Sequence, residues 1–239
     1  MSISLTWFFW SVALLVVWLV VYLSLHRKAS RKEMLIVSLW TSLFGLTEPL
    51  FVPEYWDPQS LFDLAARTGF DIESLLFAFG IGGLATVIYE RIFRVGHRPL
   101  SSAEKHHARH RYHRVILLIA PVLFFLLLFF THLNPIYVTM IALFGGGLAT
   151  WYCRPDLKKK MFTSAVIFTL LYTVYFLSLI AFSPGYVETV WNLEVLSGVL
   201  LLGIPLEELG FAFTLGFMWS SVYEHIRWET LVEIDSKNI

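Results

Sequence analysis

The segment GFDIESLLFAFGIGGLATVIYE at residues 69–90 decides the fold, because a related segment, GIPLEELGFAFTLGFMWSSVYE, follows 134 residues later at residues 203–224. Nine of the 22 aligned positions are identical without a gap. They include a glutamate near each end, since Glu73 matches Glu207 and Glu90 matches Glu224. Apolar segments resemble one another by chance, but matching glutamates at both ends seldom arise that way. The sequence therefore predicts an internal repeat.

The composition around these segments indicates an integral membrane protein. Of the 239 residues, 57% are hydrophobic and 15% are charged, which is too little charge to cover a soluble surface. The apolar residues fall in blocks of roughly 17–23, the length that crosses a hydrocarbon core of about 30 Å. We expect an all-α membrane protein of about seven transmembrane helices. The expected spans are residues 4–25, 33–50, 72–93, 114–131, 135–152, 161–183 and 205–226.

Basic residues predict how these spans are oriented. With seven spans, 17 of the 18 Lys and Arg residues fall on one side, and only Arg67 falls on the other. Positive loops face the cytoplasm, so we expect a multi-pass protein of the cell membrane with its N-terminus outside and its C-terminus inside. The first apolar block is predicted to be a retained span, because no basic residues precede it and no small-residue cleavage site follows. A six-span alternative would break the charge alternation.

The repeat suggests how one membrane domain, residues 1–239, is organised. We expect two parallel three-helix repeats plus a connecting helix, because the third and seventh spans run in the same direction. The predicted parts are repeat A at residues 1–95, a connector helix with a basic, His-rich lead-in at 96–133, repeat B at 134–228 and a cytoplasmic tail at 229–239.

Three glutamates, Glu73, Glu207 and Glu208, stand in the first turn of their spans. Helix capping is one explanation, because a carboxylate there complements the helix macrodipole by about 0.3–1 kcal/mol. A functional role is the other, because acids within a bilayer are costly and mark functional sites. Acids converging on one cavity between the halves would hold a proton through desolvation and mutual repulsion. These three residues are therefore our candidates for a general acid.

Other polar residues admit structural explanations. Most outer acids, Glu48 among them, are expected in water. Glu90 and Glu224 are expected to pair at the interface with nearby arginines such as Arg91 and Arg227. The glycines at 82–83 and 145–147 favour close helix packing over phosphate binding. Zero net charge argues against a nucleic-acid partner.

A histidine-rich loop connects the two predicted halves. His106, His110 and His113 share one helical face at i, i+4 and i+7, a spacing that is able to hold zinc. The alternative is a basic helix lying on anionic lipid. Because Arg109 and Arg111 would repel a cation, we predict no metal and no cofactor.

The run Pro205, Leu206, Glu207, Glu208, Leu209, followed by Phe-Ala-Phe, resembles the Pro-x-Glu-Glu signature of the lycopene cyclase domain family. These are the small membrane carotenoid cyclases of the heterodimeric bacterial, archaeal and fungal type. The resemblance implies two copies of a three-helix unit. The first copy departs from the signature, with Asp71 in place of proline and Ser74 in place of the second glutamate. An asymmetric site, with Glu207 and Glu208 acting and Glu73 assisting, follows as one interpretation.

The family resemblance implies a chemistry and a substrate. An acid protonates the terminal double bond of an acyclic polyene such as lycopene, the carbocation closes a ring, and loss of a proton ends an isomerisation without net redox change. Aromatic faces stabilise a cation by about 0.5–2 kcal/mol each. The alternative for these rings is packing against lipid. The candidate substrate-binding residues are Phe77, Phe79, Phe211, Phe213, Trp56, Trp191 and Asp71.

The sequence leaves two alternatives to the cyclase open. The chain is either a carotenoid cyclase-like enzyme or a non-catalytic membrane protein that binds a polyene or quinone, and a proton-coupled transporter is a third alternative. The expected partners are a lipid-soluble polyene and membrane lipid. Homo-oligomerisation is left open by the sequence.

Overall fold

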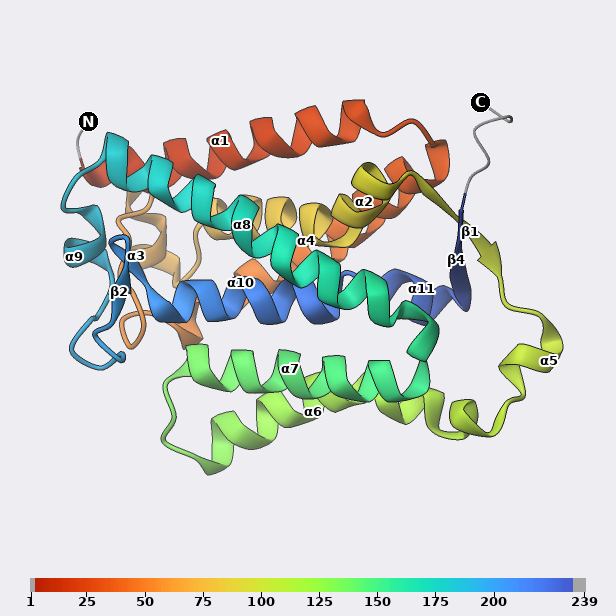
Figure 1. The fold of residues 1–239 in the computed structure, drawn as a ribbon. Helices are drawn as coiled ribbons and strands as arrows, with labels where there is room; N and C mark the ends of the chain where they lie inside the picture. Colours follow the sequence, from red (N-terminus) through yellow and green to blue (C-terminus); the bar gives the residue numbers. More distant parts are fainter. Residues whose placement is uncertain (1–2, 234–239) are drawn as a thin grey trace.

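A computed structural model describes residues 3–233, and these are mostly helical (Figure 1). The last part of the predicted tail, residues 234–239 with Lys237, lies outside the described residues. The elements, in chain order, are α1 (Ile3–Ser24), α2 (Lys28–Ser42), η1 (Leu43–Leu50), η2 (Leu61–Asp63), α3 (Leu64–Thr68), α4 (Ile72–Phe93), β1 (Val95–Pro99), α5 (Ser102–Lys105), η3 (Ala108–Tyr112), α6 (His113–Phe130), α7 (Pro135–Cys153), η4 (Pro155–Leu157), α8 (Lys158–Phe182), α9 (Tyr186–Val190), β2 (Leu200–Leu201), β3 (Ile204–Pro205), α10 (Leu206–Trp219), α11 (Val222–Arg227) and β4 (Glu229–Glu233).

Within the described residues, five helical segments are long and apolar enough to cross a membrane, namely 5–24, 72–93, 108–130, 135–153 and 155–182. The other two predicted spans, 33–50 and 205–226, are each divided. Helix α2 continues into η1, which contains Pro49, and α10 is followed by α11 after a turn at Ser220 and Ser221. Pro49 lacks the amide hydrogen of a regular helix, which fits the end of the helical segment at Leu50. The count of seven spans stays a prediction.

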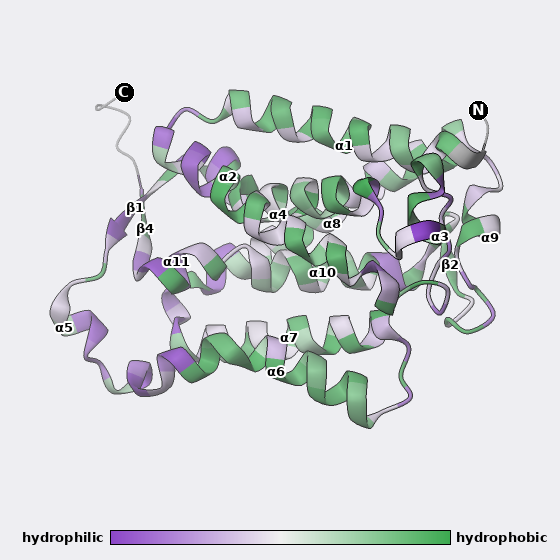
Figure 2. Cartoon of the chain, turned by 180° about the vertical axis from the view of Figure 1, so that it is seen from behind, coloured by the Kyte–Doolittle hydropathy of each residue, from purple (hydrophilic) through white to green (hydrophobic). Residues whose placement is uncertain are grey.

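The outer surface of the bundle suits a membrane. Large apolar side chains are exposed along α1, α6 and α8, for example Val20 at 62%, Phe129 at 74% and Val174 at 66%. Figure 2 shows hydrophobic residues along the long helices, and hydrophilic residues around β1, β4, α5 and the start of α2 at one end of the bundle. Apolar groups need no water in a bilayer, and the polar end matches the interface. The chain is a membrane protein.

The two related segments adopt closely matching local structure. Helix α4 begins at Ile72 and α10 begins 134 residues later at Leu206. Gly69 and Gly203, which precede them, both adopt a positive φ, +80° and +83°, which glycine reaches without steric cost. The corresponding C-terminal positions, Arg94 and Trp228, are both left-handed as well, with φ of 53° and 57°.

Short strands correct the all-α expectation. After the left-handed residues that follow α4 and α11, the chain runs into β1 and β4, which pair antiparallel from Val95 with Glu233 to Pro99 with Glu229. The strands β2 and β3 form a second small hairpin before α10. The left-handed residues end the helical path of the chain. The backbone amide and carbonyl groups that follow no longer bond within a helix, so they form hydrogen bonds between the two strands. These strands lie outside the helices that carry the core.

Glycines shared by the two segments lie at close helix contacts. A Cβ built on Gly82 of α4 would lie 2.2 Å from Thr41 Oγ1 of α2. One built on Gly216 of α10 would lie 2.9 Å from the Cα of Ala165 in α8. Each glycine therefore allows its helix to pack directly on a neighbour, as expected for small residues between membrane helices.

Candidate active site

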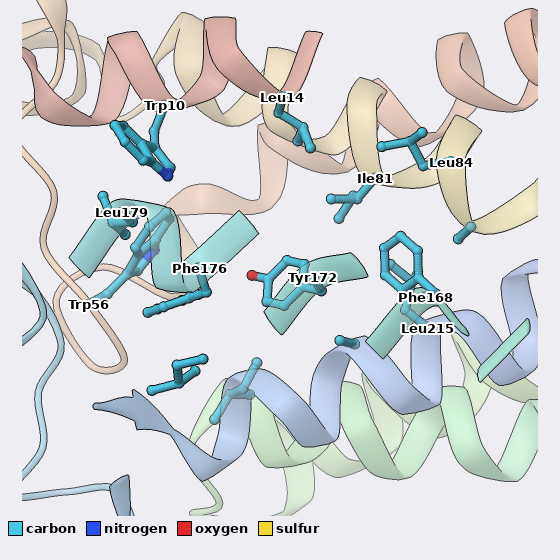
Figure 3. Close-up of a cluster of buried hydrophobic side chains, with 14 of the residues drawn as sticks. Trp10, Leu14, Trp56, Ile81, Leu84, Phe168, Tyr172, Phe176, Leu179 and Leu215 are labelled. Atoms are coloured by element: carbon cyan, nitrogen blue, oxygen red, sulfur yellow. The ribbon is translucent and has the colours of Figure 1, made fainter. Parts of the chain in front are cut away.

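An elongated cavity of about 520 Å³ lies between the two related helices. Its wall is mainly aromatic and aliphatic, and its lining residues on α10 run from Glu208 to Trp219, which corresponds to about 17 Å of helix. Figure 3 shows Tyr172 and Phe176 of α8 extending into the space between α10 and the helices α1 and α4. A long, narrow apolar molecule suits such a space better than a compact polar one.

Two carboxylates, Glu48 and Glu208, are the only ionisable acids or bases other than tyrosine in the described wall of this cavity. Glu208 lies in the first turn of α10 and is 5% exposed. Tyr172 Oη donates a hydrogen bond to its Oε2 over 2.5 Å, and Trp191 Nε1 donates to its Oε1 over 2.8 Å. Tyr55 Oη donates to Oε1 as well. Three neutral donors thus converge on one carboxylate.

The donors around Glu208 come from separate parts of the chain. Tyr172 lies on α8, Tyr55 follows η1, and Trp191 directly follows α9. The segments that carry Trp56 and Trp191 are held together by a backbone bridge between these two residues, whose rings are 5.5 Å apart between centroids. The polar end of the cavity is therefore assembled from α8 and from the segments that precede α4 and α10.

Glu48 differs from Glu208 in its surroundings. It lies on η1, is 7% exposed, and its Oε1 has no hydrogen-bond partner among the described residues. Its polar neighbours are Asp71, Ser74 and Trp56. Ser74 occupies the repeat position that matches Glu208, so the second acid approaches the corresponding place from another helix. Glu48 is an exception to the expectation that most of these acids lie in water, because η1 turns it into the bundle.

Glu73 and Glu207, the repeat-matched glutamates, are buried but do not line the cavity. Oε1 of Glu73 accepts a hydrogen bond from the amide of Leu61 over 2.7 Å, and Oε1 of Glu207 accepts one from the amide of Ser197 over 2.8 Å. Tyr137 Oη also donates to Glu207 over 2.5 Å. Each glutamate therefore fastens the loop that precedes its own helix.

The predicted substrate-binding residues are distributed unevenly. Trp56, Phe77, Phe211 and Trp191 line the cavity. Phe79 instead packs on Trp18, at 4.9 Å between ring centroids, and Phe213 packs in a separate cluster around Phe217. Asp71 caps α4 by accepting a hydrogen bond from the amide of Ser74. The wall also includes Trp7, Trp10, Tyr55, Tyr172, Tyr175 and Phe176, which sequence reasoning missed.

A second buried cluster of charges lies near the other end of the related helices. Lys160 Nζ donates to Oε1 of both Glu90 and Glu224. Glu33 lies 3.7 Å from the same ammonium, and His97 Nε2 is 3.0 Å from Glu224 Oε1. The expectation that Glu90 and Glu224 pair with interfacial arginines was wrong, because α8 brings one buried lysine between them.

His97, on β1 beyond the end of α4, is held protonated by this cluster. Burial alone would lower its pKa, but hydrogen bonds to Glu224 and Glu90 and the nearby charge of Glu33 raise that pKa to about 10. The positive charges of Lys160 and of protonated His97 both face the three carboxylates, which limits the repulsion among these carboxylates. The cluster joins α2, α4, α8, α11 and β1.

The family comparison agrees with the motif in α10. The model of the lycopene cyclase family matches residues 134–226, which run from the start of α7 into α11 and include Glu207 and Glu208. The resemblance predicted from the Pro-x-Glu-Glu motif is therefore confirmed for this part of the chain. No curated protein and no solved structure matches the chain.

Proposed function

Starting from the match of residues 134–226 to lycopene cyclase, we propose that this chain is a membrane carotenoid cyclase of the lycopene β-cyclase type. One observation carries the proposal. Within the matched region, Glu208 lies at the polar end of an elongated aromatic cavity and receives three neutral hydrogen-bond donors. A cavity of this lining favours a linear hydrocarbon. Among the described residues of its wall, the two acids are the groups suited to transfer a proton to such a substrate.

The reaction is an isomerisation in which a proton enters and a proton leaves. The proton adds to the terminal double bond of the acyclic polyene and leaves a tertiary carbocation. An internal double bond attacks this cation and forms the ring bond, which moves the positive charge to a ring carbon. Loss of a neighbouring proton to a carboxylate restores a double bond, so neither oxidant nor cofactor is required.

We assign different roles to the two acids of the cavity. The Oε1 of Glu48 lacks a hydrogen-bond donor among the described residues, and a buried carboxyl with one unpaired oxygen is poorly suited to carry charge. Glu48 is therefore the proton donor. Hydrogen bonds from Tyr55, Tyr172 and Trp191 favour the charged form of Glu208 against the opposing effect of its burial, so we assign to it the stabilisation of the carbocation and the receipt of the final proton. Glu73 and Glu207 act as positioning residues that hold the outer loops.

Aromatic rings at the cavity wall support the carbocation. Phe77 lies 6.3 Å from Tyr172 between ring centroids, and Trp7 lies 5.3 Å from Phe77. A cation in contact with such ring faces gains about 0.5–2 kcal/mol from each. The same rings exclude water, which would otherwise trap the cation as an alcohol.

The cavity also reaches the lipid-facing surface. Its wall includes Phe44 of η1 and Phe125 of α6, whose side chains are 53% and 52% exposed. A polyene dissolved in the bilayer is thus able to enter sideways without crossing water. This access route fits a lipid-soluble substrate and agrees with the membrane location.

The proposal includes the arrangement of two three-helix units, with α1, α2 and α4 in one and α7, α8 and α10 in the other. The matched helix starts, the positive φ of Gly69 and Gly203 and the pairing of β1 with β4 support it. Acids from both units then face one substrate. Seven crossings, with the basic loops in the cytoplasm, complete this arrangement.

Expression in a bacterium that accumulates lycopene tests the function. We expect a cyclic pigment with the wild-type chain, and its loss in Glu208→Gln and Glu48→Gln, each of which keeps a side chain of similar volume. Glu54→Gln, a change in the outer segment that follows η1, is the matched control and should keep the activity. Acyclic pigment alone, with the wild-type protein folded in the membrane, would leave a polyene-binding role and exclude the cyclase for lycopene.

A further inference from the structure

We propose that the chain binds one zinc ion at the basic end of the bundle through His110, His113 and Cys153. These residues come from three elements. His110 lies on η3, His113 is the first residue of α6, and Cys153 is the last residue of α7. His113 and Cys153 are 4% and 0% exposed, so the folded helices bring them together. The nitrogen and sulfur donors are the types that zinc prefers.

The distances among the donor atoms fit a tetrahedral ion. Cys153 Sγ lies 3.3 Å from Nδ1 of His110 and 3.6 Å from Nδ1 of His113. One ligand atom from each of the three residues lies within 4.8 Å of the other two. Zinc bonds of about 2.3 Å to sulfur and about 2.0–2.1 Å to nitrogen, at tetrahedral angles, place sulfur and nitrogen about 3.5 Å apart. The site therefore needs little adjustment to take the ion.

The surroundings of the cluster are polar and buried. The His225 ring lies 4.4 Å from that of His113, and its Nδ1 contacts Thr150 Oγ1 at 3.3 Å. His225 does not belong to the group of ligand atoms that lie within 4.8 Å of one another. A water molecule would therefore complete the four positions that zinc prefers.

The nearby positive charge does not prevent binding, contrary to the expectation from Arg109 and Arg111, because both of these arginines are exposed and water screens their charge. Arg154 follows Cys153 directly, but its guanidinium is engaged by both carboxylate oxygens of Asp156, at 3.0 and 2.7 Å. It also donates to the backbone carbonyl oxygens of Glu224 and Glu229. The arginine charge is thus compensated locally, and the thiolate offsets one of the two charges of zinc.

The ion would serve as a structural clamp. It would join the basic ends of α6 and α7, where the ring of Trp228 stacks on His113 at 3.6 Å between centroids. Helix α10 separates this place from Glu208 by about 20 Å. His106, which the spacing had grouped with the other two histidines, is absent from the cluster because η3 does not continue α5 as one helix.

Metal binding to the full chain, purified in detergent and first treated with a chelator, tests the site. We expect one zinc per chain by elemental analysis, and a thiolate-to-metal charge-transfer band when cobalt replaces zinc. Cys153→Ser should abolish the band. His110→Ala, at a half-buried position, should weaken zinc binding by more than about tenfold. His106→Ala is the matched control and should bind like the wild type.

The result that overturns the site is equally direct. The site is excluded if the wild type binds no more zinc than the Cys153→Ser/His110→Ala double variant. It is also excluded if cobalt binds without the charge-transfer band. If Cys153→Ser fails to fold, His110→Ala against His106→Ala still decides the question. These readouts do not depend on cyclase activity.

Discussion

Replacing Lys160 by methionine should destabilise the protein strongly, because this lysine holds three buried carboxylates together. Its ammonium donates to Glu90 and Glu224 and lies 3.7 Å from Glu33, and all four side chains are at most 1% exposed. Methionine keeps much of the volume but removes the charge. The three carboxylates would then face only His97.

The size of the effect follows from these contacts. A hydrogen bond to a charged group contributes about 1.5–3 kcal/mol, and Lys160 makes two of them. Leaving partners of a buried ion pair without compensation costs about 3–5 kcal/mol. We expect Lys160→Met to lower the free energy of unfolding by about 3–5 kcal/mol. Adding Glu224→Gln should restore part of that loss, since it removes one of the stranded charges.

Reversible unfolding in mixed detergent micelles, followed by circular dichroism, measures this loss. Lys159→Met is the matched control, because Lys159 is the exposed neighbour on the same helix, and it should change stability little. The reasoning is refuted if Lys160→Met and Lys159→Met are equally stable, or if Glu224→Gln makes the Lys160→Met chain less stable still.

Two further predictions concern the charge cluster and the helix contacts. The raised pKa of His97, about 10 against an ordinary 6.5, means that its stabilising contribution is complete below about pH 6.5 and lost as the pH rises through about 10. The melting temperature of the wild type should therefore exceed that of His97→Gln near pH 6, and this difference should shrink near pH 10.5; a constant difference would contradict the assignment. Gly216→Ala should cost about 1–3 kcal/mol, because the new methyl group meets the backbone of α8 at 2.9 Å. Gly145→Ala, which meets only the end of the Leu123 side chain, should cost less, and equal unfolding free energies would contradict the close contact.

The helical content and the location of the related segments could be predicted from the sequence, because both depend on local patterns. Apolar blocks of membrane length predicted the long helices, and the match between residues 69–90 and 203–224 predicted that α4 and α10 share their start and local structure. The divided helices were harder to foresee. The change from α2 to η1 falls at Leu43, well before Pro49, and the turn after α10 carries only two serines.

The candidate site was predicted only in part, for a physical reason. Identity between the two related segments singled out Glu73 and Glu207, yet each of these accepts a hydrogen bond from the loop before its own helix. The cavity acids Glu48 and Glu208 occupy positions that do not match in the two segments, so identity between the segments could not reveal them. Glu208 was found through the family motif.

Contacts between residues that are distant in the sequence could not be predicted from a pattern in one chain. Tyr55 and Tyr172 reach Glu208 across 153 and 36 residues, and Lys160 reaches Glu90 across 70. Cys153 meets His110 across 43 residues, so the histidine spacing alone missed the sulfur ligand. Such contacts depend on how the helices pack, which a one-dimensional pattern does not specify.

Ring closure in heavy water tests the central claim most directly. The purified chain in liposomes, supplied with an acyclic carotene in deuterated buffer, should yield a cyclic isomer carrying one deuterium for each ring, because the first step adds an acidic proton from an exchangeable carboxyl group. Glu208→Gln should yield none. The deuterium content of the separated pigments is measured by mass spectrometry. The account is contradicted if the wild type gives no cyclic product, or gives a cyclic product without deuterium.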